Sequence, residues 1–296
     1  MTGYYDRPIL KRPTWTWQVP CYLFAGGMAG AASTLAAAAE VRGDRDLARR
    51  AWLVALAGIG ASPPLLISDL GRPERFHHML RVFKPTSPMN MGSWILTATG
   101  AAIALGGARS ILGWFPRLGR LSSATAVLGP ALSTYTGVLV ADTAIPVWHE
   151  ARRELPWVFA AGSAASAGSA VALIGGGAPA RRLALVGAAG ELAATAVMER
   201  RLGELGEPYR EGEAGRFARG AKVAVAAGLG LLASGRGPAA ARRPAAARTR
   251  TAAGAALLLA GAMATRWSVY KAGLQSAADP RYVIEPQRAR RAAPTT

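Results

Sequence analysis

Long stretches without a formal charge are the feature of this sequence that most restricts its fold. Five of them lie in the first 180 positions, with 27, 18, 24, 21 and 26 residues, and they cover residues 13–39, 51–68, 85–108, 121–141 and 155–180. A helix needs about 20 mainly apolar residues to cross the hydrocarbon core of a bilayer. Five such stretches predict a polytopic membrane protein.

Weaker apolar segments continue this pattern in the remainder of the chain. One charge, Glu191, interrupts the segment 183–198, and two shorter uncharged segments follow it. The sequence therefore predicts an all-α integral membrane protein, a bundle of eight transmembrane helices with both termini on the same face. We expect one domain over residues 1–296, with spans at approximately 18–39, 51–68, 91–112, 122–141, 157–175, 183–198, 217–235 and 251–266.

The net charge of +18 does not by itself indicate a nucleic-acid-binding protein. The arginines lie mainly in the loops between the predicted spans and form no basic stripe along one element. We therefore expect membrane lipid head groups and partner subunits as the counter-charges, and no nucleic acid.

Eight spans would place both chain ends on one face, together with the loops near 69–90, 142–156 and 199–222. This face, called here the terminal face, carries most of the acidic residues and all three histidines. The terminal face is the expected docking and reaction surface. Counts of basic residues in the loops leave its side of the membrane open.

Histidine and cysteine placement restricts the cofactors. Cys21 is the single cysteine, and an iron–sulfur cluster usually takes four thiolates. His77, His78 and His149 all fall in terminal-face loops, whereas a b-type haem in a membrane usually needs imidazoles within the helices. We expect no haem, no iron–sulfur cluster and no metal site in this chain, so a redox role would depend on a partner and a diffusible carrier.

The densest group of chemically active side chains lies in residues 62–94. Asp69 stands at the end of the second predicted span, Gly71 and Pro73 break the helix after it, and Arg72 follows closely. A carboxylate beside a guanidinium at a membrane boundary can be a simple ion pair or anchor. The alternative is a proton-accepting carboxylate beside the head group of a bound molecule.

The end of the fourth predicted span repeats this composition. Tyr135 and Asp142 are seven residues apart, which puts them on one face of a continuous helix, and His149 follows in the next loop. Reduction of a quinone consumes two protons with two electrons, so membrane-edge carboxylates, a tyrosine and nearby histidines favour quinone chemistry.

Glu191 stands near the middle of the sixth predicted span. An ionisable residue at that depth is costly in hydrocarbon and usually faces the bundle interior, a pathway or a partner. Two interpretations stay open, a proton path or water cavity and a structural hydrogen bond between helices.

Several segments together resemble the NrfD-type, or polysulfide-reductase membrane-subunit, family. The most distinctive are DLGRPERF at residues 69–76 and KPTSPMNMGSW at residues 84–94, and the resemblance extends from about Tyr4 to Arg288. It implies an eight-helix, haem-free subunit of the cell membrane. Such subunits pair with a ferredoxin-like iron–sulfur subunit bound to a molybdenum or tungsten catalytic subunit, and they exchange electrons with the quinone pool.

The resemblance also implies a position for the quinone, with menaquinone as the favoured carrier and formate or a sulfur compound as the substrate of the complex. It places the terminal face outside the cytoplasm. The residues expected at the quinone, including the catalytic candidates Asp69, Tyr135 and Asp142, are Trp17, Gln18, Asp69, Arg72, Tyr135, Asp142 and His149.

The sequence does not exclude two other functions. The first is a proton or ion translocator that uses Glu191, Asp142 and Asp69, which would need a connected polar path across the bundle. The second is a passive membrane anchor without a quinone site.

Overall fold

The chain folds into long helices, as expected for an all-α protein. The computed structural model describes residues 9–114, 123–235 and 244–292, and the regular elements of these residues are all helical. In chain order they are α1 (Gln18–Val41), α2 (Arg45–Ser68), η2 (Pro73–Leu80), α3 (Pro88–Leu112), α5 (Thr125–Ala141), α6 (Pro146–Glu150), α7 (Leu155–Leu173), α8 (Gly177–Leu202), η4 (Gly203–Tyr209), α9 (Gly212–Ser234), α11 (Pro244–Ala278) and α12 (Arg281–Ala292).

Several helices are long and apolar enough to cross a membrane. Within the described residues six meet both conditions, namely α1, α2, α3, α7, α9 and α11, and α5 is a shorter apolar helix. The helix α8 is 26 residues long, but Glu191 lies in its middle, between Arg182 and Glu199 near its two ends. These charges keep α8 below the required apolarity, so the expected number of eight spans stays a prediction.

Helix boundaries follow local sequence signals. The Asp44 side chain caps the start of α2 by accepting a hydrogen bond from the Leu47 amide at 3.0 Å. Ser87 caps α3 in the same way, with Pro88 in the first turn. Gly113 ends α3 with a φ of 72°, a conformation that favours glycine.

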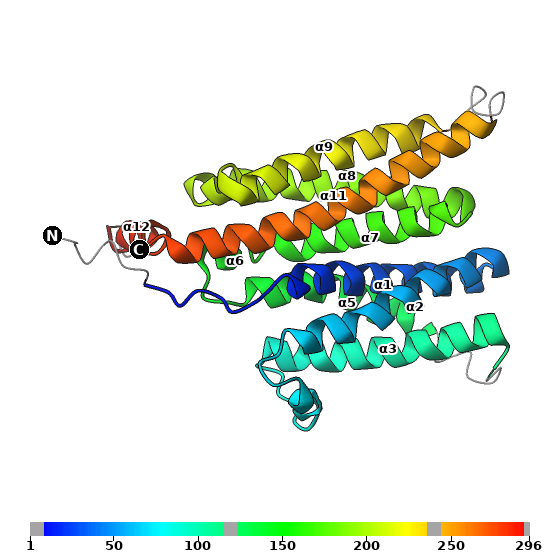
Figure 1. Ribbon diagram of the computed structural model, residues 1–296, viewed down its shortest axis with the longest axis horizontal. Helices are drawn as coiled ribbons and strands as arrows, with labels where there is room; N and C mark the ends of the chain where they lie inside the picture. Colours follow the sequence, from blue (N-terminus) through cyan, green and yellow to red (C-terminus); the bar gives the residue numbers. More distant parts are fainter. Residues whose placement is uncertain (1–8, 115–122, 236–243, 293–296) are drawn as a thin grey trace.

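The long helices lie in two groups whose axes run roughly parallel (Figure 1). The N-terminal half comprises α1, α2, α3 and α5, in which α1 packs mainly against α2 and α5. The C-terminal half comprises α7, α8, α9 and α11, in which α11 packs on α9 and α7 on α8. The helix α7 also contacts α1 and α5, so it joins the two halves.

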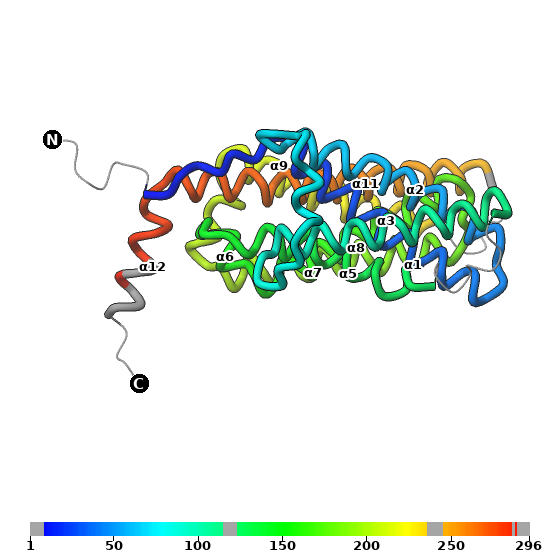
Figure 2. The backbone as a smooth tube through the Cα atoms, turned by 90° about the horizontal axis from the view of Figure 1, so that it is seen from below, coloured from blue at the N-terminus to red at the C-terminus, as the bar shows by residue number. Residues whose placement is uncertain are grey.

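One end of the bundle gathers the short elements. The first described residues, α6 and α12 lie at this end (Figure 1), and α12 turns away from the long axis of the bundle (Figure 2). This terminal end corresponds to the predicted terminal face. The position of the two chain termini relative to a membrane stays a prediction.

Small residues bring the helices close together. In α1 more than half of the apolar window is buried within the protein. A Cβ atom added to Gly58 of α2 would lie 2.8 Å from the Ala25 carbonyl oxygen and 3.0 Å from the Ala29 side chain, both in α1. Close backbone approach through Gly and Ala is how helices gain contact in lipid, where no hydrophobic force drives them together.

We predict that Gly58→Ala destabilises the protein by about 1–3 kcal/mol, because the added methyl group overpacks the α1–α2 contact. Gly60→Ala is the matched control on the same helix, since nothing lies within 4 Å of its added Cβ. Thermal unfolding in detergent measures both variants. Equal unfolding midpoints for the two variants would show that the α1–α2 contact accommodates the added methyl group without a loss of stability.

Candidate functional site

A small cavity lies in the N-terminal half, near the terminal end. It has a volume of about 50 Å³. Five helices, α1, α2, η2, α3 and α5, supply its walls together with the chain before α1. The lining consists of Trp15, Val19, Tyr22, Leu66, Asp69, Leu70, Met79, Met89, Gly92, Ser93, Tyr135 and Leu139. Two of the predicted catalytic residues, Asp69 and Tyr135, therefore meet here although they are far apart in the sequence.

Asp69 is held in place by the segment that precedes α1. The residue lies at the C-terminal end of α2, and its Oδ1 accepts hydrogen bonds from the Thr16 amide at 2.9 Å and the Thr16 hydroxyl at 2.5 Å. The Thr16 hydroxyl also contacts Oε1 of Gln18. Gln18, a predicted quinone residue, thus lies beside the group that orients Asp69.

Tyr135 projects from α5 toward the start of α3. Its side chain is 6% exposed, and its hydroxyl donates a hydrogen bond to the Pro88 carbonyl. A Cβ atom at Gly92 would overlap the tyrosine ring. The glycine in the segment KPTSPMNMGSW therefore provides the space that Tyr135 occupies.

Asp142 does not share this cavity, although its spacing from Tyr135 predicts a common helix face. The helix α5 ends at Ala141, and Asp142 has φ −86° and ψ 60°, outside the helical region. Its side chain is exposed and does not line the cavity. Asp142 is the residue that ends α5, and its amide still donates to the Val138 carbonyl, but its side chain lies beyond the cavity lining.

Four other predicted quinone residues also lie outside the cavity lining, namely Gln18, Trp17, Arg72 and His149. Trp17 is 57% exposed, and Arg72 and His149 are exposed as well. Conversely, sequence reasoning missed Tyr22 and Ser93, which line the cavity. Tyr22 follows Gln18 by one helical turn, so the period of α1 could have indicated it.

An apolar groove adjoins the cavity. It lies between α2, η2 and α3 and has a volume of about 190 Å³. It shares Leu66, Met79 and Ser93 with the cavity, and its complete lining is Ile59, Pro63, Leu66, Ile67, Phe76, Met79, Leu80, Ser93, Leu96, Thr97, Gly100 and Ala101. A cavity that contains a few polar side chains and an apolar groove thus share one wall.

The segment before α1 also connects the cavity to the C-terminal half. The Trp15 ring, which lines the cavity, stacks on Trp148 of α6 with ring centroids 5.2 Å apart. The Trp15 carbonyl accepts a hydrogen bond from the Tyr270 hydroxyl of α11 at 2.6 Å. Trp148 in turn donates to the Val269 carbonyl at 2.7 Å.

Glu191 is buried in the C-terminal half, as its mid-span position predicts. It is 1% exposed, and its Oε1 lies 3.4 Å from Nη1 of Arg266, which is fully buried. The same guanidinium donates to the Phe159 carbonyl at 2.8 Å, the Ser163 hydroxyl at 3.2 Å and the Ala262 carbonyl at 3.1 Å. Arg266 therefore connects α7, α8 and α11.

Arg266 is the functional candidate that sequence reasoning did not single out. The sequence places it at the end of the eighth expected span, but α11 continues to Ala278. A charge that limits an apolar stretch is expected at the membrane boundary, whereas this one lies inside the bundle because acceptors on neighbouring helices surround it. Only the packing of α7 against α11 makes these acceptors available.

Metal ligands do not gather in the part of the chain that the structure describes. There, no group of three or more His, Cys, Asp or Glu side chains could hold a metal ion. Cys21 is a free, half-buried thiol.

We predict that Arg266→Met destabilises the protein by about 3–5 kcal/mol, because removal of one partner leaves the Glu191 carboxylate buried without its counter-charge. The double variant Glu191→Leu with Arg266→Met should recover part of this loss, since it removes both charges. Arg216→Met is the control, because Arg216 is 72% exposed and lies 4.0 Å from its partner Glu213. A double variant less stable than the single Arg266→Met, measured by thermal unfolding in detergent, would contradict the pair's role.

Comparison with known proteins identifies the family. The family model described as Polysulphide reductase, NrfD, matches residues 10–182, more than half of the 296-residue chain. No curated protein was found to match the chain. The matched region contains the cavity and the groove, whereas Arg266 and Glu191 lie beyond it. The match confirms the resemblance seen at residues 69–76 and 84–94, and the chain therefore belongs to the NrfD family of polysulphide reductases, as a multi-pass membrane protein.

Proposed function

We propose that this chain is the membrane-anchoring, quinone-reactive subunit of a multisubunit oxidoreductase. One observation carries the proposal, namely the cavity that holds the polar side chains of Asp69 and Tyr135 and shares a wall with an apolar groove. A quinone of the membrane pool has the same two parts, a polar head group and a long apolar tail. Membership of the NrfD family supports the same function.

The residues present fit such a molecule. Asp69, Tyr135 and Ser93 offer hydrogen-bonding groups at the cavity, and the groove offers aliphatic and aromatic walls for the tail. The cavity alone is smaller than a typical ligand site, which has about 300–1,000 Å³. Met79 lies in the wall between the two spaces, and methionine is unbranched and flexible, so its movement would join them.

A bound quinone would supply the acceptor for two electrons and two protons. The chain's own residues would hold the head group and exchange its protons. Both bonds from Thr16 end on Oδ1 of Asp69, so we assign proton exchange to Oδ2. The Tyr135 hydroxyl, now bonded to the Pro88 carbonyl, would hold a head-group oxygen by hydrogen bonding. Roles for Trp17, Arg72, Asp142 and His149 at the quinone stay predictions.

Electrons would come from a partner, in this proposal a ferredoxin-like iron–sulfur subunit bound to a molybdenum or tungsten subunit that handles formate or a sulfur compound. The cavity lies near the terminal end, where the partner would have to approach. Exposed apolar side chains at this end fit a docking partner, since Trp17, Val82 and Phe83 are 57%, 61% and 61% exposed. We place the complex in the cell membrane, with the terminal face outside the cytoplasm. The proposed electron carrier is menaquinone.

We predict that Asp69→Asn lowers quinone-linked turnover of the complex at least tenfold while activity with an artificial dye persists, because the amide keeps the shape and removes the proton acceptor. Tyr135→Phe should chiefly raise the Michaelis constant for quinone, since it removes a hydrogen bond made in the bound state. The control is Glu211→Gln, an exposed carboxylate at the start of α9. Equal loss of quinone and dye activity in Asp69→Asn would favour a passive anchor.

We predict that Gly100→Leu raises the Michaelis constant for a long-tailed quinone several-fold but not for a tailless analogue, because the added side chain fills the groove. A Cβ at Gly100 would lie 3.4 Å from Ile59, so the backbone can accept it. Ala104→Leu is the control, an exposed position of α3 outside the groove lining. Steady-state kinetics with both quinones measures the effect, and an equal change for both would place the tail elsewhere.

A further inference from the structure

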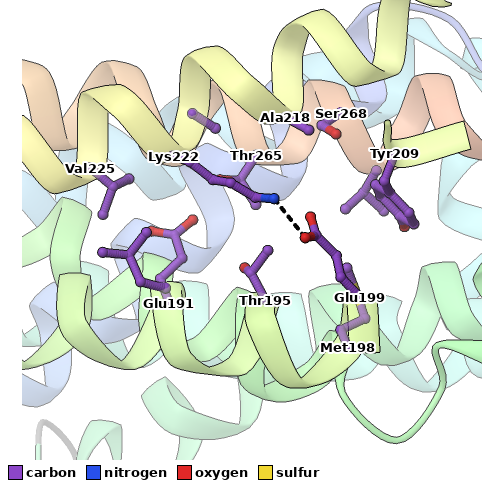
Figure 3. Close-up of a pocket in the computed structure, with 13 residues that line it drawn as sticks. Glu191, Thr195, Met198, Glu199, Tyr209, Ala218, Lys222, Val225, Thr265 and Ser268 are labelled. Atoms are coloured by element: carbon purple, nitrogen blue, oxygen red, sulfur yellow. Dashed lines mark hydrogen bonds and ion pairs between the residues drawn. The ribbon is translucent and has the colours of Figure 1, made fainter. Parts of the chain in front are cut away.

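A second cavity lies in the C-terminal half, between α8, α9 and α11, and several polar side chains belong to its lining (Figure 3). Its volume is about 20 Å³, which is room for about one water molecule. Its lining is Glu191, Leu192, Thr195, Met198, Glu199, Tyr209, Ala218, Ala221, Lys222, Val225, Thr265, Ser268 and Val269. The quinone proposal uses none of these residues.

Polar side chains of α8 follow one another along this cavity. Glu191, Thr195 and Glu199 stand at intervals of four residues, and all three point toward α9 and α11 (Figure 3). At 1.5 Å per residue, this series covers about 12 Å along the helix axis. It runs from the middle of α8 toward the terminal end of the bundle.

The inner end of the series holds a buried oxygen that lacks a hydrogen bond. Oε1 of Glu191 pairs with Arg266, but Oε2 has no hydrogen-bond partner among the described residues. A buried carboxylate oxygen without a partner is costly, and a water molecule in the cavity would satisfy it.

The outer end holds an ion pair with access to the outside. Lys222 of α9 lies 2.6 Å from Oε2 of Glu199, and the two side chains are 43% and 19% exposed. The nearby Tyr209 hydroxyl is buried and also lacks a hydrogen-bond partner among the described residues. Each end of the cavity lining thus holds a buried polar atom that a water molecule beside it would satisfy.

Arg266 can keep its charge while Glu191 changes its own. Three further acceptors, the Phe159 and Ala262 carbonyls and the Ser163 hydroxyl, surround the guanidinium. The charged and titratable groups that face Glu191 from the packed elements are Arg266 of α11, Glu199 of α8, Lys222 of α9 and Tyr209 of η4, and α7 contributes Ser163. The Arg266 guanidinium therefore keeps three hydrogen-bond acceptors when the Glu191 carboxylate is neutralised.

We propose that Glu191 is a proton-exchanging site, reached from the terminal end through the Glu199–Lys222 pair, the Thr195 hydroxyl and a cavity water. A proton from bulk water adds to the Glu191 carboxylate and gives the neutral acid, and the reverse step returns it. The site is separate from the proposed quinone site and lies outside the segment that matches the family.

The test is infrared spectroscopy of the full chain in lipid vesicles, which needs neither quinone nor partner. Acidification should produce a carboxylic acid carbonyl band that shifts in D₂O and is absent from Glu191→Gln. Thr195→Val should slow deuterium exchange of this band about tenfold, because it removes one hydrogen-bonded step while keeping the shape. Thr134→Val is the control, since the Thr134 hydroxyl bonds to the Pro130 carbonyl in α5, away from the cavity.

A purely structural ion pair would give a different result. In that case no acid band would depend on Glu191 over the pH range in which the protein stays folded, or Thr195→Val would exchange at the same rate as Thr134→Val. Either outcome overturns the proposal. If Glu191→Gln does not fold, as judged by circular dichroism, Glu191→Asp replaces it, because a shorter carboxylic acid should displace the band. Failure here leaves the quinone proposal untouched, since the two use different residues and readouts.

Discussion

The hydrocarbon core of a membrane offers no hydrogen-bond partners, and the arrangement of this protein depends on that constraint. Backbone polar groups are satisfied inside long helices, so the chain builds a bundle rather than a mixed fold. Since lipid tails are as apolar as leucine, the helices hold together through close contact at small residues, as Gly58 against α1 illustrates. Polar side chains within the bundle must then find partners in one another, and the burial of Arg266 and Glu191 follows from this requirement.

Two cavities in the bundle bring polar side chains together. In the N-terminal half they gather near the terminal end, where Asp69 and Tyr135 meet beside an apolar groove. In the C-terminal half they follow α8 inward from the Glu199–Lys222 pair to the Glu191–Arg266 pair. One chain segment touches both regions, because Thr16 bonds to Asp69 while the neighbouring Trp15 carbonyl accepts a bond from Tyr270. Tyr270 follows Arg266 by one turn of α11, so the two places are mechanically connected through rigid elements.

The candidate site shows which expectations from the sequence agree with the structure. Helix periodicity and charge-free length locate the long helices well, since both properties are local to each segment. The position expected for Asp69 also holds, since the residue ends α2 at the terminal end of the bundle and lines the cavity there. Asp142, by contrast, ends α5 and lies outside the cavity lining, so its role at the quinone stays a prediction. Seven-residue spacing places two side chains on one face of a helix, but the packing of the surrounding helices decides how far a cavity extends along that face.

The sequence by itself determined that this is an all-helical membrane protein and that Glu191 points inward. These conclusions follow from the cost of placing charge in hydrocarbon, which depends on composition more than on neighbours. The tertiary structure alone decided which polar groups meet. It turned Arg266 from a boundary charge into the buried partner of Glu191, because α7 and α8 bring their acceptors to it. It also placed Tyr22, Ser93 and Met79 around the cavity, since residues from α1, α3 and η2 become neighbours only when the helices pack.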